Sequence, residues 1–358
     1  MFMLKSDREI RIAILKSDSE RNYHLWISAI RETITNSKIE LFSFLSDQDF
    51  KRLLSGEFDL ILATPCGTSQ RNKRIYDEKW WALSQSKQTL TYPSVKEIFL
   101  YENKRNLRDW LLVCKVPHPE TFVFFEKDEA MAFAQSNVQF PIVGKTNIGA
   151  SGNGVVVLRN RNQLNEYVLS AFGEGVKYKS GPKWLKGSIW KKLFKVLKDP
   201  NFFKKRMAEY RLAKAETQRD MMILQEFVEH EFEWRCVRIG ESYFAHKKLA
   251  INNMSSGTLL KGYGSVPFEL LDFIRNLTEE NQLSSVSIDI FESPKGYLVN
   301  EIQTFFGQSD PYQMLIDGIQ GRYIYKDNRW QFEEGEFNQW ECYQLRLSHA
   351  LELWKRGR

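Results

Sequence analysis

The stretch that decides the fold is Pro141-Ile-Val-Gly-Lys145-Thr-Asn-Ile-Gly149-Ala-Ser151-Gly152-Asn-Gly154-Val-Val-Val-Leu158. A β-branched strand ends at Lys145, a loop rich in glycine follows, and a second apolar strand begins directly after Gly154. Glycine lets the backbone turn its NH groups towards a ligand, and lysine adds a full positive charge. The stretch is therefore either a phosphate-binding loop or a tight hairpin turn, and both readings stay open at this point.

Length and composition are those of an ordinary globular chain. The 358 residues are 42% apolar and 27% charged, which is enough for two or three domains with their own cores. Charge appears at Lys5, before any apolar run of signal-peptide length, and no stretch approaches the roughly 18 apolar residues of a membrane span. We therefore expect a cytoplasmic location. The 4 cysteines are scattered without paired spacing, so neither a disulfide framework nor a zinc knuckle is indicated.

The positive charge belongs to one segment. Residues 176–220 hold 14 Lys or Arg against 4 Asp or Glu, a local charge of +10, whereas the whole chain carries +6. Leu185, Ile189, Leu193 and Leu197 recur every fourth residue, which predicts an amphipathic helix. Such a helix can lie peripherally on an anionic membrane, bind an anionic polymer, or pack as an ordinary helix with a solvated face. No aromatic RNA-binding box or zinc finger accompanies the segment, so nucleic acid is not favoured as a partner.

The first part of the chain alternates strand and helix patterns. Short apolar runs at 10–15, 39–44 and 58–63 are typical of buried strands, and helical spacing separates them. This alternation predicts a small parallel α/β domain over residues 1–95.

Three later stretches carry candidate functional residues. Lys104 opens a predicted helix ahead of a proline-marked turn, although taken alone it would be a surface lysine. A strand over 221–227 runs into Glu233-Trp-Arg235, and a further strand ends near Lys248.

A predicted hairpin near residue 295 places Asp289 and Glu301 on adjacent apolar strands. Because alternate residues of a strand share a face, Gln303 points the same way as Glu301. Three oxygen donors on one face suit Mg²⁺, which prefers carboxylates and completes its shell with waters and substrate phosphates. The alternative is an acidic hairpin that is merely exposed.

Over about residues 95–310, the order and spacing of these residues resemble the ATP-grasp superfamily, nearest to its ribosomal-protein glutamate ligase branch. The resemblance implies a mixed α/β and α+β fold, with the small parallel α/β domain standing before the ATP-grasp module. It also implies ATP and Mg²⁺ as cofactors. The family usually has asparagine as its third metal ligand, where this chain has the longer Gln303.

The same resemblance assigns roles residue by residue. Arg235 and Lys248 match catalytic positions, with Arg235 expected to contact the transferred phosphoryl group or acyl phosphate, and Asp289, Glu301 and Gln303 match the metal ligands. The residues implied to bind the nucleotide are Lys104, Lys145, Gly149, Ser151, Gly152, Gly154, Gln225, Glu226, Phe227, Val228 and Glu233.

The resemblance also predicts the domain order. We expect the α/β domain over 1–95, a lid subdomain over 96–220 with a basic helical insertion at 176–220, a nucleotide- and metal-binding subdomain over 221–321, and a helical extension over 322–358. Nothing in the family accounts for the basic insertion.

The implied activity is ATP-dependent joining of a carboxylate to an amine through an acyl phosphate, with release of ADP and phosphate. The substrates would be small-molecule or peptide carboxylates and amines, and basic residues at Arg71, Lys73 and 176–220 favour an anionic acceptor. Two alternatives stay open: a kinase of the same fold that phosphorylates a hydroxyl, and a nucleotide-binding module without turnover that uses 176–220 to meet a partner or membrane. The chain has no GxxxxGK[ST] loop and no HRD or DFG motif, so a P-loop enzyme and a protein kinase are not supported.

Overall fold

The computed structural model describes residues 8–17, 20–67, 69–86, 89–149, 154–177, 217–251, 254–255, 260–308 and 310–357. Ser151, Gly152 and most of the basic segment lie outside these residues. The chain splits into two compact units, described separately below. Unit 1 comprises Met1–Cys66, Lys73–His118 and Val228–Arg358, and unit 2 comprises Gly67–Asn72 and Pro119–Phe227. The four-part division expected from the sequence stays a prediction.

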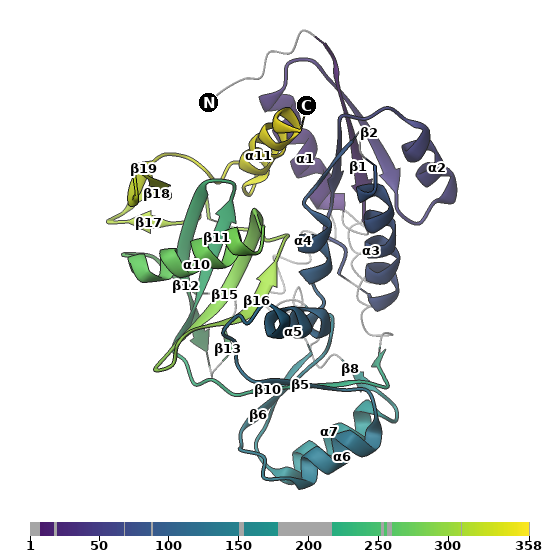
Figure 1. Ribbon diagram of the computed structural model, residues 1–358, viewed down its shortest axis with the longest axis vertical. Coiled ribbons are helices and arrows are strands. Elements are labelled where there is room, and N and C mark those ends of the chain that lie inside the picture. The colour runs from purple at the N-terminus through teal and green to yellow at the C-terminus, as the bar shows by residue number, and fades with distance from the viewer. Residues whose placement is uncertain are drawn as a thin grey trace, which may run out of the picture. The chain divides into compact units, whose positions relative to one another are not determined.

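A parallel sheet with the strand order β2-β1-β3-β4 forms the amino-terminal part of unit 1 (Figure 1). Its strands are β1 (Ile10–Lys16), β2 (Ser37–Ser43), β3 (Leu60–Ala63) and β4 (Leu90–Tyr92). The connections contain α1 (Glu20–Thr33), α2 (Asp47–Ser55) and α3 (Gln70–Ser84). Every residue of β3 is buried, as expected for a parallel strand with both faces covered. The small parallel α/β domain is confirmed.

Two helices follow this sheet, α4 (Val95–Leu100) and α5 (Lys104–Val113). A capping box joins Ser94 and Glu97 at the start of α4. The same Glu97 carboxylate accepts hydrogen bonds from the backbone NH groups of Ser284 and Ser285, both at 2.7 Å. One buried carboxylate thus caps a helix and also fixes the start of a strand in the larger sheet.

The larger sheet of unit 1 has the order β16-β15-β11-β12-β18-β17, and β13, β14 and β19 pair at its sides. The main strands are β11 (Phe232–Ile239), β12 (Ser242–Ile251), β15 (Ser285–Ser293), β16 (Gly296–Gln303), β17 (Leu315–Ile316) and β18 (Ile319–Lys326). The side strands are β13 (Met254–Ser255), β14 (Lys261–Gly262) and β19 (Arg329–Glu334).

The two faces of this sheet differ in chemistry. Trp234, Cys236 and Ile288 belong to an apolar core with residues of α10 (Phe268–Glu280). Arg235 lies between Trp234 and Cys236 in the sequence, and Asp289 follows Ile288. By strand alternation, Arg235 and Asp289 point to the other face. One face therefore builds the core under α10, and the other face carries charge.

The carboxyl-terminal part of unit 1 corrects one expectation. A helical extension was expected over 322–358, but its first part forms the β18–β19 hairpin, and only α11 (Tyr343–Arg356) is a long helix. Asp327 and Asn328 both have positive φ, 54° and 57°, which is the backbone of a type I′ hairpin turn. The Asp-Asn pair between alternating aromatic residues is a hairpin signal in the sequence, and the expectation of a helix did not take it into account.

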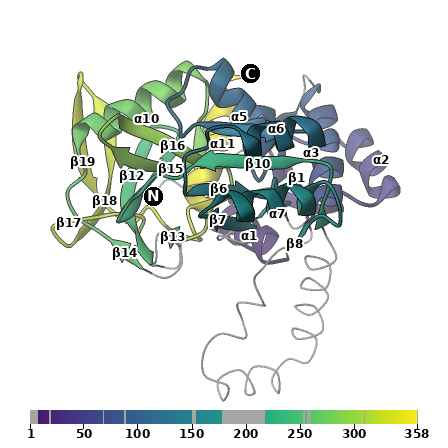
Figure 2. The same cartoon turned by 90° about the horizontal axis from the view of Figure 1, so that it is seen from below.

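Unit 2 contains a sheet with the order β5-β10-β6-β7. Its strands are β5 (Thr121–Phe124), β10 (Met222–Glu226), β6 (Ile142–Lys145) and β7 (Val155–Leu158). Helices α6 (Lys127–Gln135) and α7 (Arg161–Ala171) cover one face of it and share its apolar core (Figures 1 and 2). A short pair, β8 (Val176–Lys177) with β9 (Thr217–Gln218), flanks the undescribed basic segment.

Across the described ranges, no helix combines the length and the apolar character that a bilayer crossing needs.

Candidate functional site

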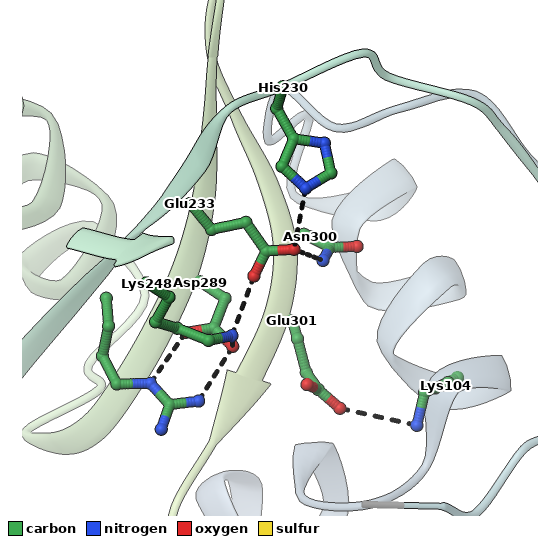
Figure 3. A network of polar contacts seen from close by, with 8 residues as sticks. Lys104, His230, Glu233, Lys248, Asp289, Asn300 and Glu301 are labelled. Atoms are coloured by element: carbon green, nitrogen blue, oxygen red, sulfur yellow. Dashed lines mark hydrogen bonds and ion pairs between the residues drawn. The ribbon is translucent and has the colours of Figure 1, made fainter. Parts of the chain in front are cut away.

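A buried ion network occupies the charged face of the large sheet in unit 1 (Figure 3). The Arg235 guanidinium donates two hydrogen bonds to Asp289, Nε to Oδ1 at 2.9 Å and Nη2 to Oδ2 at 3.0 Å. The Lys248 ammonium donates to Asp289 Oδ2 at 2.7 Å and to Glu233 Oε2 at 2.8 Å. The network therefore alternates two cations with two carboxylates, which is how buried charges are tolerated.

Glu233 has two further neighbours in this network (Figure 3). Asn300 donates from Nδ2 to Glu233 Oε1 at 3.3 Å, and His230 Nε2 lies 3.7 Å from the same oxygen. His230 Nδ1 lies 2.7 Å from the carbonyl oxygen of Val228, which accepts a hydrogen bond when that nitrogen carries the proton. The expected adenine-linker residue Val228 is thus linked through His230 to the expected ribose-binding residue Glu233.

Strand register explains why these residues meet. Arg235 on β11 pairs with His246 on β12 and with Asp289 on β15, and Asp289 pairs with Glu301 on β16. Residues directly opposite one another on antiparallel strands have adjacent side chains. One row across four strands therefore reads His246, Arg235, Asp289 and Glu301, and it brings together residues that the sequence places on separate strands.

A β-bulge modifies β16 at this row. Asp289 pairs with Glu301, but the next residue, Ile290, pairs with Val299, so Asn300 is an extra residue on β16. A bulge allows two successive side chains to project towards the same side. Asn300 and Glu301 consequently both serve the charged face, whereas simple alternation would turn Asn300 into the core.

The network sets the charges of its members. Burial opposes ionisation of Asp289, but the guanidinium of Arg235 and the ammonium of Lys248 outweigh it and lower the pKa of that carboxyl. Burial likewise opposes the charge of Lys248, and the carboxylates of Asp289 and Glu233 raise its pKa again. The pKa of Arg235 is raised for the same reason, against burial. All three groups are therefore charged at neutral pH.

Lys104 is part of the same face and is not a surface lysine. Its side chain is 13% exposed, and its Nζ lies 3.4 Å from Glu301 Oε1 and 3.9 Å from Glu102 Oε2 (Figure 3). Glu102 is buried, so Lys104 contacts one buried and one more accessible carboxylate. The start of α5 at Lys104 positions this ammonium, because the Asn103 side chain caps the helix one residue earlier.

The three predicted metal ligands come from paired strands of the large sheet. Asp289 and Glu301 pair across β15 and β16, and Gln303 pairs with Ser287, so all three oxygen donors lie on the charged face. Carboxylate and amide oxygens are the ligands that Mg²⁺ prefers, and this ion keeps several waters. No group of three His, Cys, Asp or Glu side chains suited to a metal occurs within the described residues. The metal-ligand set stays a prediction, because both carboxylate oxygens of Asp289 accept hydrogen bonds from Arg235 or Lys248 in this structure.

Unit 2 carries the glycine-rich hairpin. Lys145 is buried at the end of β6, and Thr146 NH donates to the carbonyl oxygen of Gly154 at 2.9 Å. Gly154 has φ +82°, and a Cβ there would clash with the Thr146 hydroxyl, so glycine is required. Gly149 is described, whereas the expected phosphate-binding residues Ser151 and Gly152 lie outside the described residues.

The predicted adenine linker begins in unit 2. Gln225 is buried on β10 and donates from Nε2 to Thr121 Oγ1 at 3.1 Å. Glu226 closes the strand, since its NH donates to the Glu120 carbonyl at 2.8 Å. Phe227 follows as the last residue of unit 2. The side chain of Gln225 is therefore engaged within the sheet.

Lys73, one of the basic residues expected to favour an anionic acceptor, is paired inside unit 1. Lys73 is buried in α3, and its Nζ lies 2.5 Å from both carboxylate oxygens of Asp77 and 3.0 Å from the Ile98 carbonyl. Lys73 therefore forms a buried ion pair in unit 1, and it gives no support for an anionic substrate.

Sequence reasoning missed three residues of the charged face: His230, His246 and Asn300. No local pattern marks them: His246 is positioned by strand register, Asn300 by the bulge, and His230 by the loop before β11, where its ring contacts the Val228 carbonyl.

No protein-family profile matches the chain, and no curated protein matches it in sequence. Solved structures do match its fold. The RimK domain ATP-grasp protein of Sphaerobacter thermophilus has a TM-score of 0.51 at 14% identity over 83% of this chain and 92% of that chain. The D-alanine–D-alanine ligase of Bacillus anthracis has 0.53 at 12% identity over 98% and 100%. The N5-carboxyaminoimidazole synthetase of Staphylococcus aureus, complexed with ADP, has 0.54 at 11% identity over 86% and 73%.

Proposed function

From the ATP-grasp fold that this chain has, we propose that the protein is an ATP-dependent ligase that joins a carboxylate to an amine through an acyl phosphate. The observation that carries the proposal is the row of Arg235, Asp289 and Glu301 across three paired strands, with Lys248 beside it. It combines forked cationic donors with oxygen ligands for Mg²⁺ on one face. Phosphoryl transfer needs this combination, because its catalysis is almost entirely positioning and charge stabilisation.

The basic residues would hold the phosphates. Lys104 and Lys145 each offer an ammonium held on a regular element, and the loop that begins after Lys145 offers backbone NH groups. Arg235 would hold an oxygen of the acyl phosphate with guanidinium N–H groups other than the two that Asp289 accepts from in this structure. Glu233 would bind the ribose, and Phe227 and Val228 would bond the base through their backbones.

Mg²⁺ would be held by Asp289 and Glu301, with Gln303 beside them, and would offset the negative charge of the nucleotide phosphates. Arg235 and Lys248 keep Asp289 ionised, since they lower its pKa against the effect of burial, and Asp289 would have to release one of their hydrogen bonds to bind Mg²⁺.

The first test is nucleotide binding by thermal unfolding, with ATP and Mg²⁺, for the wild type, Lys145→Ala and Glu301→Ala. A ligand at 100 times its dissociation constant adds about 2.7 kcal/mol of stability, so the wild type should shift clearly. The matched control is Lys326→Ala, which removes an exposed lysine at the end of β18 and should shift like the wild type. Absence of a wild-type shift at millimolar ATP contradicts the proposal.

The second test separates the ligase from a kinase of the same fold. Hydroxylamine traps an acyl phosphate as a hydroxamate, whereas a phosphorylated hydroxyl gives none. Carboxylate-dependent hydroxamate formation supports the ligase. ADP release that depends on a hydroxyl compound, without hydroxamate, supports the kinase, and ATP binding without turnover supports the non-catalytic alternative.

A further inference from the structure

A second polar cluster in unit 1 lies next to the ion network, on β14 and on the loops that follow β14 and β16. Its centre is the Asp310 carboxylate. Tyr263 donates its hydroxyl to Asp310 Oδ2 at 2.5 Å, and Lys261 donates from Nζ to the same oxygen at 3.0 Å. Both donors converge on Oδ2, and among the described residues none donates to Oδ1. The Asp310 side chain is 35% exposed, so Oδ1 is a carboxylate oxygen available to a ligand.

The cluster holds this carboxylate in its ionised form. The hydrogen bond from Tyr263 lowers the pKa of Asp310, and Lys261 adds to the effect against partial burial. Burial and the neighbouring carboxylate raise the pKa of Tyr263, which therefore stays a donor. Gln308 fixes the arrangement, because it accepts from Lys261 and donates to the Tyr263 hydroxyl.

A second acceptor belongs to His246, whose ring contacts the ring of Tyr263. His246 Nδ1 is 2.9 Å from the Gln313 carbonyl oxygen, which can only accept, so Nδ1 carries the proton and Nε2 carries a lone pair. Burial, and then the positive charge of Arg235, lower the pKa of His246 to about 3, so the ring is neutral at neutral pH. Its ring centroid is 5.6 Å from that of Tyr263. Within the described part of the chain, Nε2 has no hydrogen-bond partner.

Asp310 Oδ1 and His246 Nε2 are both hydrogen-bond acceptors, so a ligand that binds to both must supply the donors. A primary amine is such a ligand: its ammonium form has three N–H donors, and its neutral form still has two. A carboxylate or phosphate would meet Asp310 with like charge and would find Lys261 already paired. The cluster therefore discriminates in favour of an amine.

We propose that Asp310 Oδ1 and His246 Nε2 receive the amine substrate, an inference that rests on the proposed ligase function. His246 pairs in register with Arg235, which would hold the acyl phosphate, so the amine would be adjacent to the reacting carbonyl. The ammonium binds Asp310 and releases one proton to solvent on the exposed side. The neutral nitrogen, oriented by its N–H bond to His246, attacks the acyl carbon. The C–N bond forms, the C–O bond to phosphate breaks, and phosphate leaves with that electron pair and the second proton.

The experiment uses the full chain with ATP and Mg²⁺. The twenty proteinogenic amino acids serve as carboxylates with hydroxylamine as nucleophile, and hydroxamate is measured. Because hydroxylamine is mostly unprotonated at neutral pH, it reports acyl phosphate formation without needing an ammonium site. The accepted carboxylate is then combined with the same amino acids, ethanolamine and putrescine as amines, and ADP release is measured. The variants are Asp310→Asn and His246→Gln, and the control is Asp317→Asn, the same change at an exposed hairpin turn.

The inference predicts that Asp310→Asn raises the KM for the amine about tenfold or more, since a hydrogen bond to a charged group is lost, and leaves the KM for the carboxylate, measured with hydroxylamine, at its wild-type value. His246→Gln should raise the same KM, and Asp317→Asn should leave it unchanged. An unchanged amine KM in both variants overturns the inference alone. A raised carboxylate KM in Asp310→Asn, measured with hydroxylamine, also overturns it and places the carboxylate at this cluster. No hydroxamate from the wild type with any carboxylate overturns the proposed ligase, and this inference with it.

Discussion

Arg235 and Asp289 form a two-point ion pair between β11 and β15, in which both guanidinium–carboxylate distances are 2.9–3.0 Å. The pair is in strand register, and the Asp289 side chain is almost completely buried. Lys248 shares one oxygen of the same carboxylate. Among the described residues of this network, Asp289 is therefore the carboxylate that hydrogen-bonds both buried cations, and its loss should lower the stability of the protein as well as its activity.

Asp289→Asn tests this role in stability. The substitution keeps the size of the side chain but removes the carboxylate that Arg235 and Lys248 share; Glu233 still pairs with Lys248, whereas Glu301 and Glu233 act on Arg235 only through longer-range attraction. We expect the free energy of unfolding to fall by about 3–5 kcal/mol, the usual cost of leaving a buried charge uncompensated. Urea unfolding measures the change. Asp317→Asn, the same substitution at an exposed turn, should stay within about 0.5 kcal/mol of the wild type, and a similar value for Asp289→Asn would contradict the prediction.

The glycine-rich hairpin offers a comparison at matched backbone geometry. Gly154 and Gly318 both have φ +82°, but a Cβ at Gly154 would clash with Thr146, whereas a Cβ at Gly318 meets no atom within 4 Å. Both alanine variants should lose about 1 kcal/mol from the left-handed backbone, and Gly154→Ala should lose about 1–3 kcal/mol more from overpacking. Thermal unfolding of the two variants measures the difference. Equal losses would show that the hairpin relaxes around Thr146 at no cost.

Stability should decrease in mild acid because of His349. Burial, followed by the charges of Arg238 and Arg356, lowers the pKa of this imidazole from 6.5 to about 4. Below pH 6.5 the unfolded chain takes up a proton that the folded chain takes up only near pH 4, so the folded state loses stability across that window. The loss amounts to about 3 kcal/mol, and it is complete below pH 4. Urea unfolding between pH 7 and pH 4 should show a smaller decrease for His349→Gln, and an unchanged slope would refute the assignment.

Periodicity was enough to predict the main elements of both units. The strands at 10–16 and 285–303 and the helix that begins at Lys104 follow from runs of apolar residues and from caps, which act over a few neighbouring positions. Such local signals predict which residues form an element and towards which face of it each side chain points. They correctly placed Glu301 and Gln303 on one face with Asp289.

Local signals could not predict the position of residues that depends on segments far away in the sequence. Asn300 reaches Glu233 only because β16 bulges against β15, and strict alternation would have turned it away. The burial of Lys73 was equally invisible, since a lysine four residues before an aspartate is usually a solvated helix pair. In both cases the deciding contact depends on how two segments far apart in sequence pack together.

The last helix of unit 1 completes the core of its first sheet. Tyr343, Leu347 and Leu351 of α11 pack in one apolar cluster with Trp26 and Ile30 of α1, and the Tyr343 ring meets the Trp26 ring edge-on at 4.7 Å. During synthesis, β1 to β4 emerge from the ribosome long before α11 does. At roughly 5–20 residues per second, this sheet waits at least about ten seconds with an apolar surface uncovered. The amino-terminal domain is thus made first, but its core is completed only after α11 has been made.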